Sequence, residues 1–272
     1  MQQAQYKSNY ELKYLARVQT GQHMGILAGS ILLKLLITFM SIYLISALIP
    51  AHTTTGYILN YITTFLAQVA VSLLTVGSSL IYLKTACNMP AAIADLFCGF
   101  QQNTAKILKI GAVIAIINSI CMIPLDIASV QYSDIINSIP LFQLSRGEFA
   151  LDNHELIETY NVFYSASMKF YLIMLICTVV STVLTLPFFP AFFMVIDFPD
   201  LSASAILKKC FEVMTGNKFR LFMLYLSFVP SFLLSIFTCG ITLIWVLPYM
   251  SMAETNFYLD LMSVRNKTVG SV

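Results

Sequence analysis

Several apolar stretches of this chain are long enough to cross a lipid bilayer as helices, and this constrains the fold more than any other feature. A spanning helix needs about 20 mostly apolar residues. Charged residues are only 10% of the 272 residues, whereas soluble domains have about 25%. We therefore predict an all-α polytopic transmembrane helical bundle, a single integral membrane domain over residues 1–272 with six spans. The predicted spans are Met24–Ile49, Tyr57–Leu83, Ile110–Val130, Phe170–Ile196, Phe219–Phe237 and Ile241–Tyr258.

The last two predicted spans are separated only by Thr238-Cys239-Gly240. Together they are too long for one crossing of the bilayer, so a tight hairpin is expected between them. If the turn does not form, the number of spans falls to five and the C-terminus moves to the other side of the membrane.

We predict that one unit is used three times along the chain, and that it consists of a short basic amphipathic segment followed by two apolar spans. The amphipathic segments are Tyr10–Gly21, Ala91–Lys109 and Ser202–Arg220, and the units cover residues of about 9–83, 91–196 and 202–261. A helix with one apolar and one basic face lies in the membrane interface. There it can contact anionic lipid headgroups, or it can act as an ordinary elbow helix that anchors the topology.

The basic residues of these segments are the candidate headgroup contacts. They are Lys13, Arg17, Lys106, Lys109, Lys208, Lys209, Lys218 and Arg220.

Basic residues also set the orientation, because loops on the cytoplasmic side carry an excess of lysine and arginine. With six spans, the basic segments and both termini fall on one side. The segment of about 131–168 falls on the other side and is rich in acidic residues. We predict a multi-pass protein of the plasma membrane with both termini in the cytoplasm.

The sequence offers little for catalysis. His23, His52 and His154 belong to different sides or ends of the membrane, and the six cysteines include no CxxC pair. No metalloprotease, serine-nucleophile or phosphate-loop motif occurs. We therefore expect no enzymatic activity, no metal and no cofactor. The net charge of +2 is too small to indicate nucleic acid as a partner.

Two ionisable residues lie within predicted spans, where such residues often carry function. Lys34 is about ten residues into the first span, so roughly 15 Å deep at 1.5 Å per residue. Glu254 is in the last span, and in the six-span topology both residues lie in the inner half of the bilayer. They can pair to bind a headgroup or an ion, or to fix helix packing. Alternatively, Lys34 extends its side chain to the inner surface.

Prolines interrupt the later spans. Pro187 and Pro190 lie in the fourth span, Pro230 in the fifth and Pro248 in the sixth. A proline inside a helix frees a carbonyl group and kinks the helix. Broken helices in matching places of a repeat can mark the binding site of a transporter, but here the match is partial and kinking alone is the simpler interpretation.

Three sequence blocks resemble a known family. The blocks are DLFCGF (Asp95–Phe100), the stretch Phe198–Phe228 with NPDLSA-like and KxRLFxLxLSF-like parts, and CGITLIWVLPYMSMAETNFYLDL (Cys239–Leu261). The family that they resemble is a group of bacterial membrane proteins called domain of unknown function 975. The resemblance covers most of the chain and is thinnest in the first sixty residues. It implies a bacterial plasma-membrane protein and supplies no activity and no site residues.

Two functions remain open at this point. The first is a non-enzymatic envelope scaffold or accessory subunit that contacts membrane lipid or a membrane-protein partner. The second is a permease for a small solute or a lipid that uses Lys34 and Glu254.

Overall fold

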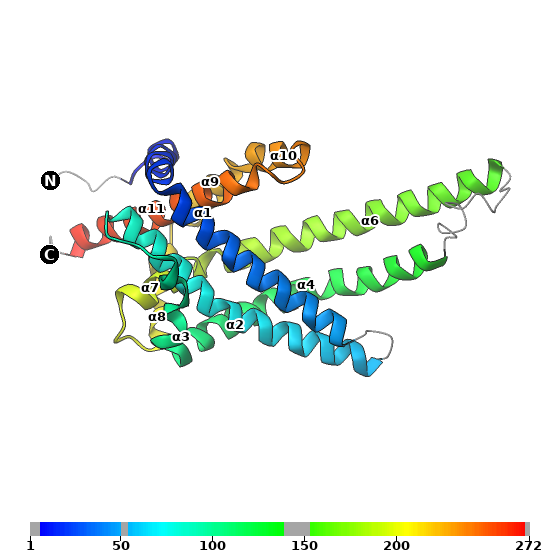
Figure 1. Ribbon diagram of the computed structural model, residues 1–272, viewed down its shortest axis with the longest axis horizontal. Coiled ribbons are helices and arrows are strands. Elements are labelled where there is room, and N and C mark those ends of the chain that lie inside the picture. The colour runs from blue at the N-terminus through cyan, green and yellow to red at the C-terminus, as the bar shows by residue number, and fades with distance from the viewer. Residues whose placement is uncertain (1–5, 50–53, 139–152, 270–272) are drawn as a thin grey trace. The chain divides into compact units, whose positions relative to one another are not determined.

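The computed structural model describes residues 6–49, 54–138 and 153–269, and within these ranges the chain forms helices and no strand (Figure 1). The chain divides into two compact units. The first comprises Met1–Ala115 and Leu186–Val272, and the second comprises Ile116–Thr185. Part of the predicted outer segment 131–168 lies outside the described residues.

Five helical segments in the described part of the chain are long and apolar enough to cross a membrane. They overlap the first five predicted spans. The sixth predicted span lies largely in a further helix, α11 (Leu243–Val269), which is not among these segments because polar residues such as Glu254 and Asn256 lower its hydropathy. The five segments are Asn9–Ile45, Ile58–Ala86, Thr104–Ser133, Tyr160–Asp197 and Lys218–Phe237.

Helix α1 (Asn9–Leu48) begins with a capping box. The backbone N–H of Glu11 donates to the Ser8 hydroxyl, and the Glu11 carboxylate accepts from the backbone N–H of Ser8 at 2.7 Å. These bonds satisfy backbone N–H groups that have no partner inside the helix. At His23 the backbone leaves helical geometry, with φ −124° and ψ 24°, and the helix kinks. The kink falls between the predicted amphipathic segment and the predicted first span.

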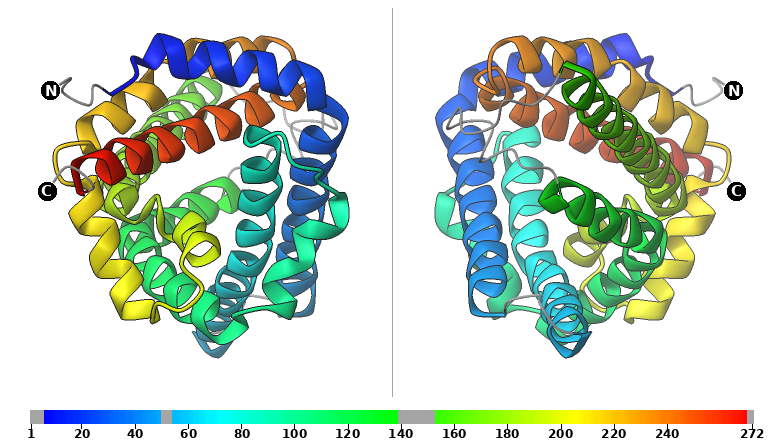
Figure 2. Two further views of the ribbon diagram at one scale, coloured as in Figure 1. Left: turned by 90° about the vertical axis from the view of Figure 1, so that its left-hand side faces the viewer. Right: turned by 90° about the vertical axis from the view of Figure 1, so that its right-hand side faces the viewer.

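The core of the first unit forms where α1 packs against α11 and against α2 (Thr54–Ala86). In both views of Figure 2, α11 passes beside the first part of α1, and the second part of α1 runs beside α2. Buried residues recur on one face of α1 at Leu12, Ala16 and Thr20, and again at Leu27 and Ile31. This spacing of four residues is that of a helix face turned to the core.

A short connection packs its backbone directly on α2. It consists of the 3₁₀ helix η1 (Ile93–Phe97) and the one-turn helix α3 (Cys98–Gln101). A Cβ atom added at Gly77 would lie 1.9 Å from the carbonyl oxygen of Leu96, and one at Gly99 would lie 2.4 Å from that of Leu73. Only glycine fits at both positions, which gives the glycine of the DLFCGF block a physical reason.

The second predicted amphipathic segment, Ala91–Lys109, is therefore not one helix. After η1 and α3, Asn103 adopts a positive φ of 55°, and α4 (Thr104–Ser138) begins. The side chain of Thr104 donates to the carbonyl of Gly99 at 3.0 Å and joins the two parts.

Prolines divide the predicted fourth span. Helix α6 (Asn153–Thr185) ends before Pro187, a 3₁₀ turn η2 (Leu186–Phe188) follows, and α7 (Ala191–Asp197) starts directly after Pro190. Pro230 stands in the first turn of α10 (Val229–Phe237), where proline is well tolerated because its missing N–H would have no partner. Pro248 is inside α11.

The third predicted amphipathic segment contains helix α8 (Ala203–Met214), capped by Ser202. Its buried residues are Ile206, Cys210, Val213 and Met214, whereas Lys208 is exposed. Gly216 then turns the chain with φ 82°, and α9 (Lys218–Leu226) follows.

The expected turn at Thr238–Gly240 does form. Cys239 and Gly240 have φ values of 50° and 85°, and the N–H of Gly240 donates to the carbonyl of Ser235 at 2.8 Å. Helices α10 and α11 contact each other on either side of this turn.

The second unit is a pair of helical stretches from α4 and α6, which run side by side in Figure 1. Tyr132 stacks on Phe170 with ring centroids 4.8 Å apart, and its hydroxyl lies 3.1 Å from that of Ser167. Apolar side chains such as Ile120 and Leu175 are about 60% exposed. Continuous exposed apolar surface of this kind is expected of a helix that faces lipid.

Candidate functional site

Lys34 and Glu254, the two intramembrane charges singled out in the sequence, line one cavity of about 200 Å³ in the first unit. Lys34 comes from α1 and Glu254 from α11, helices that pack on each other although they lie far apart in the chain. We call this space the Lys34–Glu254 cavity. The structure thus brings together the pair that was predicted from depth in the bilayer alone.

Hydroxyl groups and phenylalanine rings make the rest of the cavity wall. Helices α1, α2, α9 and α11 and the η2–α7 segment all contribute. The remaining lining residues are Thr75, Ser78, Ser79, Tyr82, Phe189, Phe192, Phe193, Tyr225, Ser251 and Thr255.

The two charges face the same space without touching. The ion pairs within 4.0 Å among the described residues do not include one between Lys34 and Glu254, although each lies within electrostatic reach of the other. Tyr225 lines the same cavity, and its hydroxyl interacts favourably with the Glu254 carboxylate. Charges removed from bulk water are costly unless they are paired and hydrogen-bonded. Lys34 and Glu254 thus present an amine and a carboxyl group to one cavity and do not form an ion pair with each other.

Several wall hydroxyls already donate their hydrogen to the backbone. Thr75 donates to the carbonyl of Val71 at 3.1 Å, Ser79 to that of Thr75 at 2.9 Å, and Thr255 to that of Ser251 at 2.9 Å. Since a hydroxyl has one hydrogen and two lone pairs, these oxygen atoms can still accept. These three hydroxyls thus contribute acceptors to the cavity wall.

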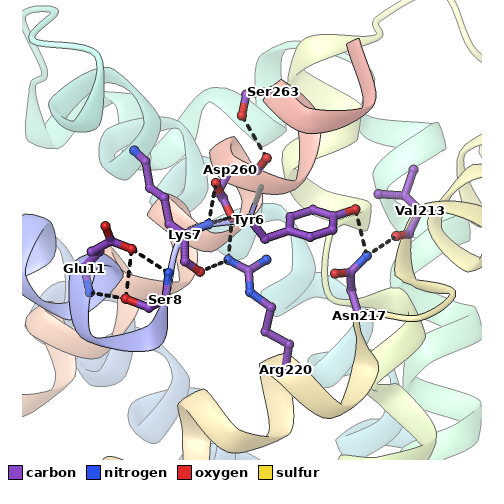
Figure 3. Close-up of polar contacts among 9 residues, drawn as sticks. All are labelled: Tyr6, Lys7, Ser8, Glu11, Val213, Asn217, Arg220, Asp260 and Ser263. Atoms are coloured by element: carbon purple, nitrogen blue, oxygen red, sulfur yellow. Dashed lines mark hydrogen bonds and ion pairs between the residues drawn. The ribbon is translucent and has the colours of Figure 1, made fainter. Parts of the chain in front are cut away.

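A second polar cluster ties the N-terminal segment to α9 and α11 (Figure 3). The backbone N–H of Lys7 donates to both carboxylate oxygens of Asp260, at 3.2 and 3.3 Å. Arg220 forms an ion pair with Asp260 and donates to the carbonyl of Lys7 at 2.7 Å. Asn217 donates to the Tyr6 hydroxyl at 3.3 Å. We call Tyr6, Lys7, Asn217, Arg220 and Asp260 the N-terminal clasp.

Aromatic rings complete the clasp. The Arg220 guanidinium lies 4.7 Å from the ring centre of Phe257 and 4.9 Å from that of Tyr6. A guanidinium held against ring faces gains attraction from their negative quadrupoles. The Asp260 side chain is only 3% exposed and the Arg220 side chain 17%, so this charge pair belongs to the packed interior.

The eight candidate headgroup contacts fall into two groups. Four are held by the protein: Arg220 in the clasp, Lys13 by the carbonyl and hydroxyl of Ser227, Lys106 by the carbonyl of Pro199, and Lys209 over the ring of Phe198 at 3.4 Å. The other four are exposed: Arg17, Lys109, Lys208 and Lys218. Of these, Lys218 lies 5.9 Å from the ring centre of Phe211.

Sequence reasoning missed the hydroxyl wall and the clasp. A signal for the wall existed, because Thr75, Ser78, Ser79 and Tyr82 follow the spacing i, i+3, i+4, i+7 and share one face of an otherwise apolar helix. No comparable signal exists for the clasp, since Lys7, Arg220 and Asp260 are far apart in the chain and their meeting depends on the tertiary fold.

Residues 1–265 match the family described as "Protein of unknown function (DUF975)", and the chain belongs to this family. The match agrees with the resemblance carried by the DLFCGF block and by the last third of the chain. No curated protein and no solved structure matches the chain.

Proposed function

We propose that this member of the family is a non-enzymatic multi-pass protein of the bacterial plasma membrane, and that it binds a small polar solute in the Lys34–Glu254 cavity and moves it across the membrane. In this proposal α11 is the sixth span and both termini are cytoplasmic. Helix α11 has 27 residues, and at 1.5 Å per residue it is about 40 Å long, enough for a bilayer core of about 30 Å.

One observation carries the proposal, the lining of a single cavity by two opposite charges that do not neutralise each other by contact. A pair that only held helices together would be expected to close into direct contact, as Arg220 and Asp260 do. Ionisable residues that face a cavity inside a membrane commonly lie on solute or ion pathways. The broken helix at η2 and α7, which contributes Phe189, Phe192 and Phe193 to the wall, also fits a transport protein.

A flux assay tests the proposal. The purified protein is reconstituted in liposomes, a mixture of small metabolites is supplied outside, and the solutes that accumulate are identified by mass spectrometry. We expect saturable uptake of at least one polar solute, abolished by Lys34→Ala or Glu254→Ala and unchanged by Glu212→Ala on the exposed surface. Uptake that is indifferent to both cavity substitutions would rule out this route.

A second candidate function is an envelope scaffold or accessory subunit that contacts anionic lipid headgroups or a membrane partner. The four exposed basic residues Arg17, Lys109, Lys208 and Lys218 favour it, since each such residue near an anionic surface contributes about 1 kcal/mol. Native mass spectrometry of gently extracted protein separates the candidates. A stoichiometric partner or retained anionic lipid, lost on neutralising the four residues, supports the accessory function, whereas a small solute lost on substituting Lys34 supports the permease.

A further inference from the structure

The charges of the Lys34–Glu254 cavity define what a ligand must carry. Lys34 can bind an anionic group and Glu254 a cationic group, and both line the same cavity. A ligand with a single charge would satisfy one of them and leave the other without a counter-charge in a site that is partly removed from water. A ligand with both charges satisfies both, and leaving a buried charge unpaired is the more expensive alternative.

The wall chemistry indicates how the cationic end is held. The oxygen atoms of Thr75, Ser79 and Thr255 can accept hydrogen bonds, because their hydrogens already serve backbone carbonyls. A primary ammonium has three donors and no acceptor, so it matches Glu254 together with acceptor hydroxyls. Phenylalanine rings in the same wall can add cation–π attraction.

The volume limits the size of the ligand. A cavity of about 200 Å³ is smaller than most ligand pockets, which measure about 300–1,000 Å³. At about 30 Å³ per water molecule it has room for roughly six or seven waters, and hence for a solute with a similar number of non-hydrogen atoms.

We propose that the Lys34–Glu254 cavity binds a short zwitterion, with its acidic group at Lys34 and its ammonium at Glu254. This inference rests on the proposed function and specifies its solute. The same chemistry occurs in a free amino acid and in the phosphoethanolamine headgroup of a lipid, so the test separates these two sources.

The experiment is calorimetric titration of the purified protein in phosphatidylcholine nanodiscs. The probes are four three-carbon compounds: 3-aminopropionate, propionate, propylamine and propanol. We expect 3-aminopropionate to bind about 10- to 100-fold more tightly than either singly charged probe, since a hydrogen bond to a charged group contributes about 1.5–3 kcal/mol. Equal or weaker binding of 3-aminopropionate would overturn the proposal.

Isosteric variants make the test independent of folding. Lys34→Met should abolish the advantage that the carboxylate provides and leave propylamine binding intact, whereas Glu254→Gln should leave propionate binding intact. The double variant should bind propanol as well as it binds the zwitterion. A uniform loss for all probes, or the same pattern in the control Glu212→Gln on the surface, would contradict the assignment of the two ends.

Phosphatidylethanolamine in the nanodisc separates the two sources. If the lipid headgroup is the ligand, this lipid should weaken the apparent binding of 3-aminopropionate by competition, and O-phosphoethanolamine should bind more tightly than 3-aminopropionate. If neither happens and 3-aminopropionate still binds, the ligand is a free solute.

The outcomes for the two proposals remain distinguishable. Binding of the zwitterion without flux would overturn the permease and leave the zwitterion site. Flux of another solute that depends on Lys34, without binding of 3-aminopropionate, would overturn the zwitterion site and leave the permease.

Discussion

The first unit contains two opposite-charge pairs that are built in opposite ways. In the N-terminal clasp, Arg220 and Asp260 are in direct contact, and each makes further hydrogen bonds to the backbone of Lys7. In the cavity, Lys34 and Glu254 stay apart and face an open space. Both pairs combine a residue of α11 with a residue of another helix, yet only in the clasp do the two charged groups contact each other and share the backbone of Lys7 as a partner.

Direct contact between the two charged groups therefore distinguishes a structural charge pair from a pair that can bind a ligand. A paired and hydrogen-bonded pair is costly to break, because removal of one partner leaves a buried charge. A pair held apart contributes little attraction, and its charges remain available. Removal of the clasp should therefore reduce stability, whereas removal of the cavity charges should reduce ligand binding.

The largest effect is expected for Asp260→Ala in the clasp. It removes the counter-charge of Arg220 and the acceptor of the Lys7 N–H, so we expect a loss of about 3–5 kcal/mol in the free energy of unfolding. Thermal unfolding in nanodiscs measures it. The control is Glu212→Ala, which breaks the exposed pair with Arg265 and should cost less than about 1 kcal/mol. Similar losses in both variants would remove the distinction between clasp and surface.

The next effect is expected for the double variant Lys34→Met/Glu254→Gln. Because it removes both unpaired charges, we expect the unfolding temperature to stay the same or to rise. Solute uptake should nevertheless fall at least about tenfold, by the loss of two charged hydrogen bonds. A marked fall in the unfolding temperature would show that these charges serve packing, as in the clasp.

A smaller effect is expected for Tyr225→Phe, which removes a hydroxyl that lines the cavity and interacts favourably with Glu254. Loss of this polar interaction should weaken binding of an ammonium-bearing solute by about five- to tenfold. Titration with propylamine measures the change. Tyr14→Phe, at a ring that is 59% exposed on α1, is the matched control and should have no effect.

The smallest effect is expected at a third pair, Lys84–Asp95, which joins α2 to η1 at 2.8 Å and is partly exposed. Burial acts to raise the pKa of Asp95, but hydrogen bonds from Lys84 and from the N–H of Ala92 outweigh it, so the pKa lies below its ordinary value. A lowered pKa stabilises the fold above the unfolded value of about 3.9, and this contribution disappears as the pH falls through the folded-state pKa.

Asp95→Asn should therefore lower stability at pH 7 by about 1 kcal/mol or less. Melting temperatures recorded from pH 7 to pH 3 should show the difference between the wild type and the variant closing at acid pH. A difference that persists unchanged at pH 3 would mean that the ionised carboxylate is not its cause.

These pairs also show what the sequence can and cannot predict. The meeting of Lys34 and Glu254 could be predicted because a bilayer supplies a depth coordinate, and charges at the same depth in one bundle are candidates to meet. The five helical segments that are long and apolar enough to cross a membrane could be predicted because length and apolar composition are local properties.

The clasp could not be predicted in this way. Lys13 and Arg220 look like interfacial lysine and arginine in the sequence, and only the tertiary fold shows that Ser227 and Asp260 hold them. The close backbone contacts at Gly77 and Gly99 could not be predicted either, because the need for glycine arises from the backbone of another segment of the chain. Pro187 and Pro190 mark the break before α7 in the sequence. That the phenylalanines of this segment line the cavity depends on how the helices pack in the tertiary structure, which the sequence does not reveal.

The packing of α1 on α11 also has a consequence for biosynthesis. Leu48 ends α1 and Leu243 begins α11 about 200 residues later. At roughly 5–20 residues per second, the ribosome needs about 10–40 s to make the partner of the first helix. During that interval Lys34 and the face of α1 that becomes buried have no α11 beside them. An insertase or a holding chaperone that shelters this helix until translation ends would be expected to decide how much protein reaches the folded state.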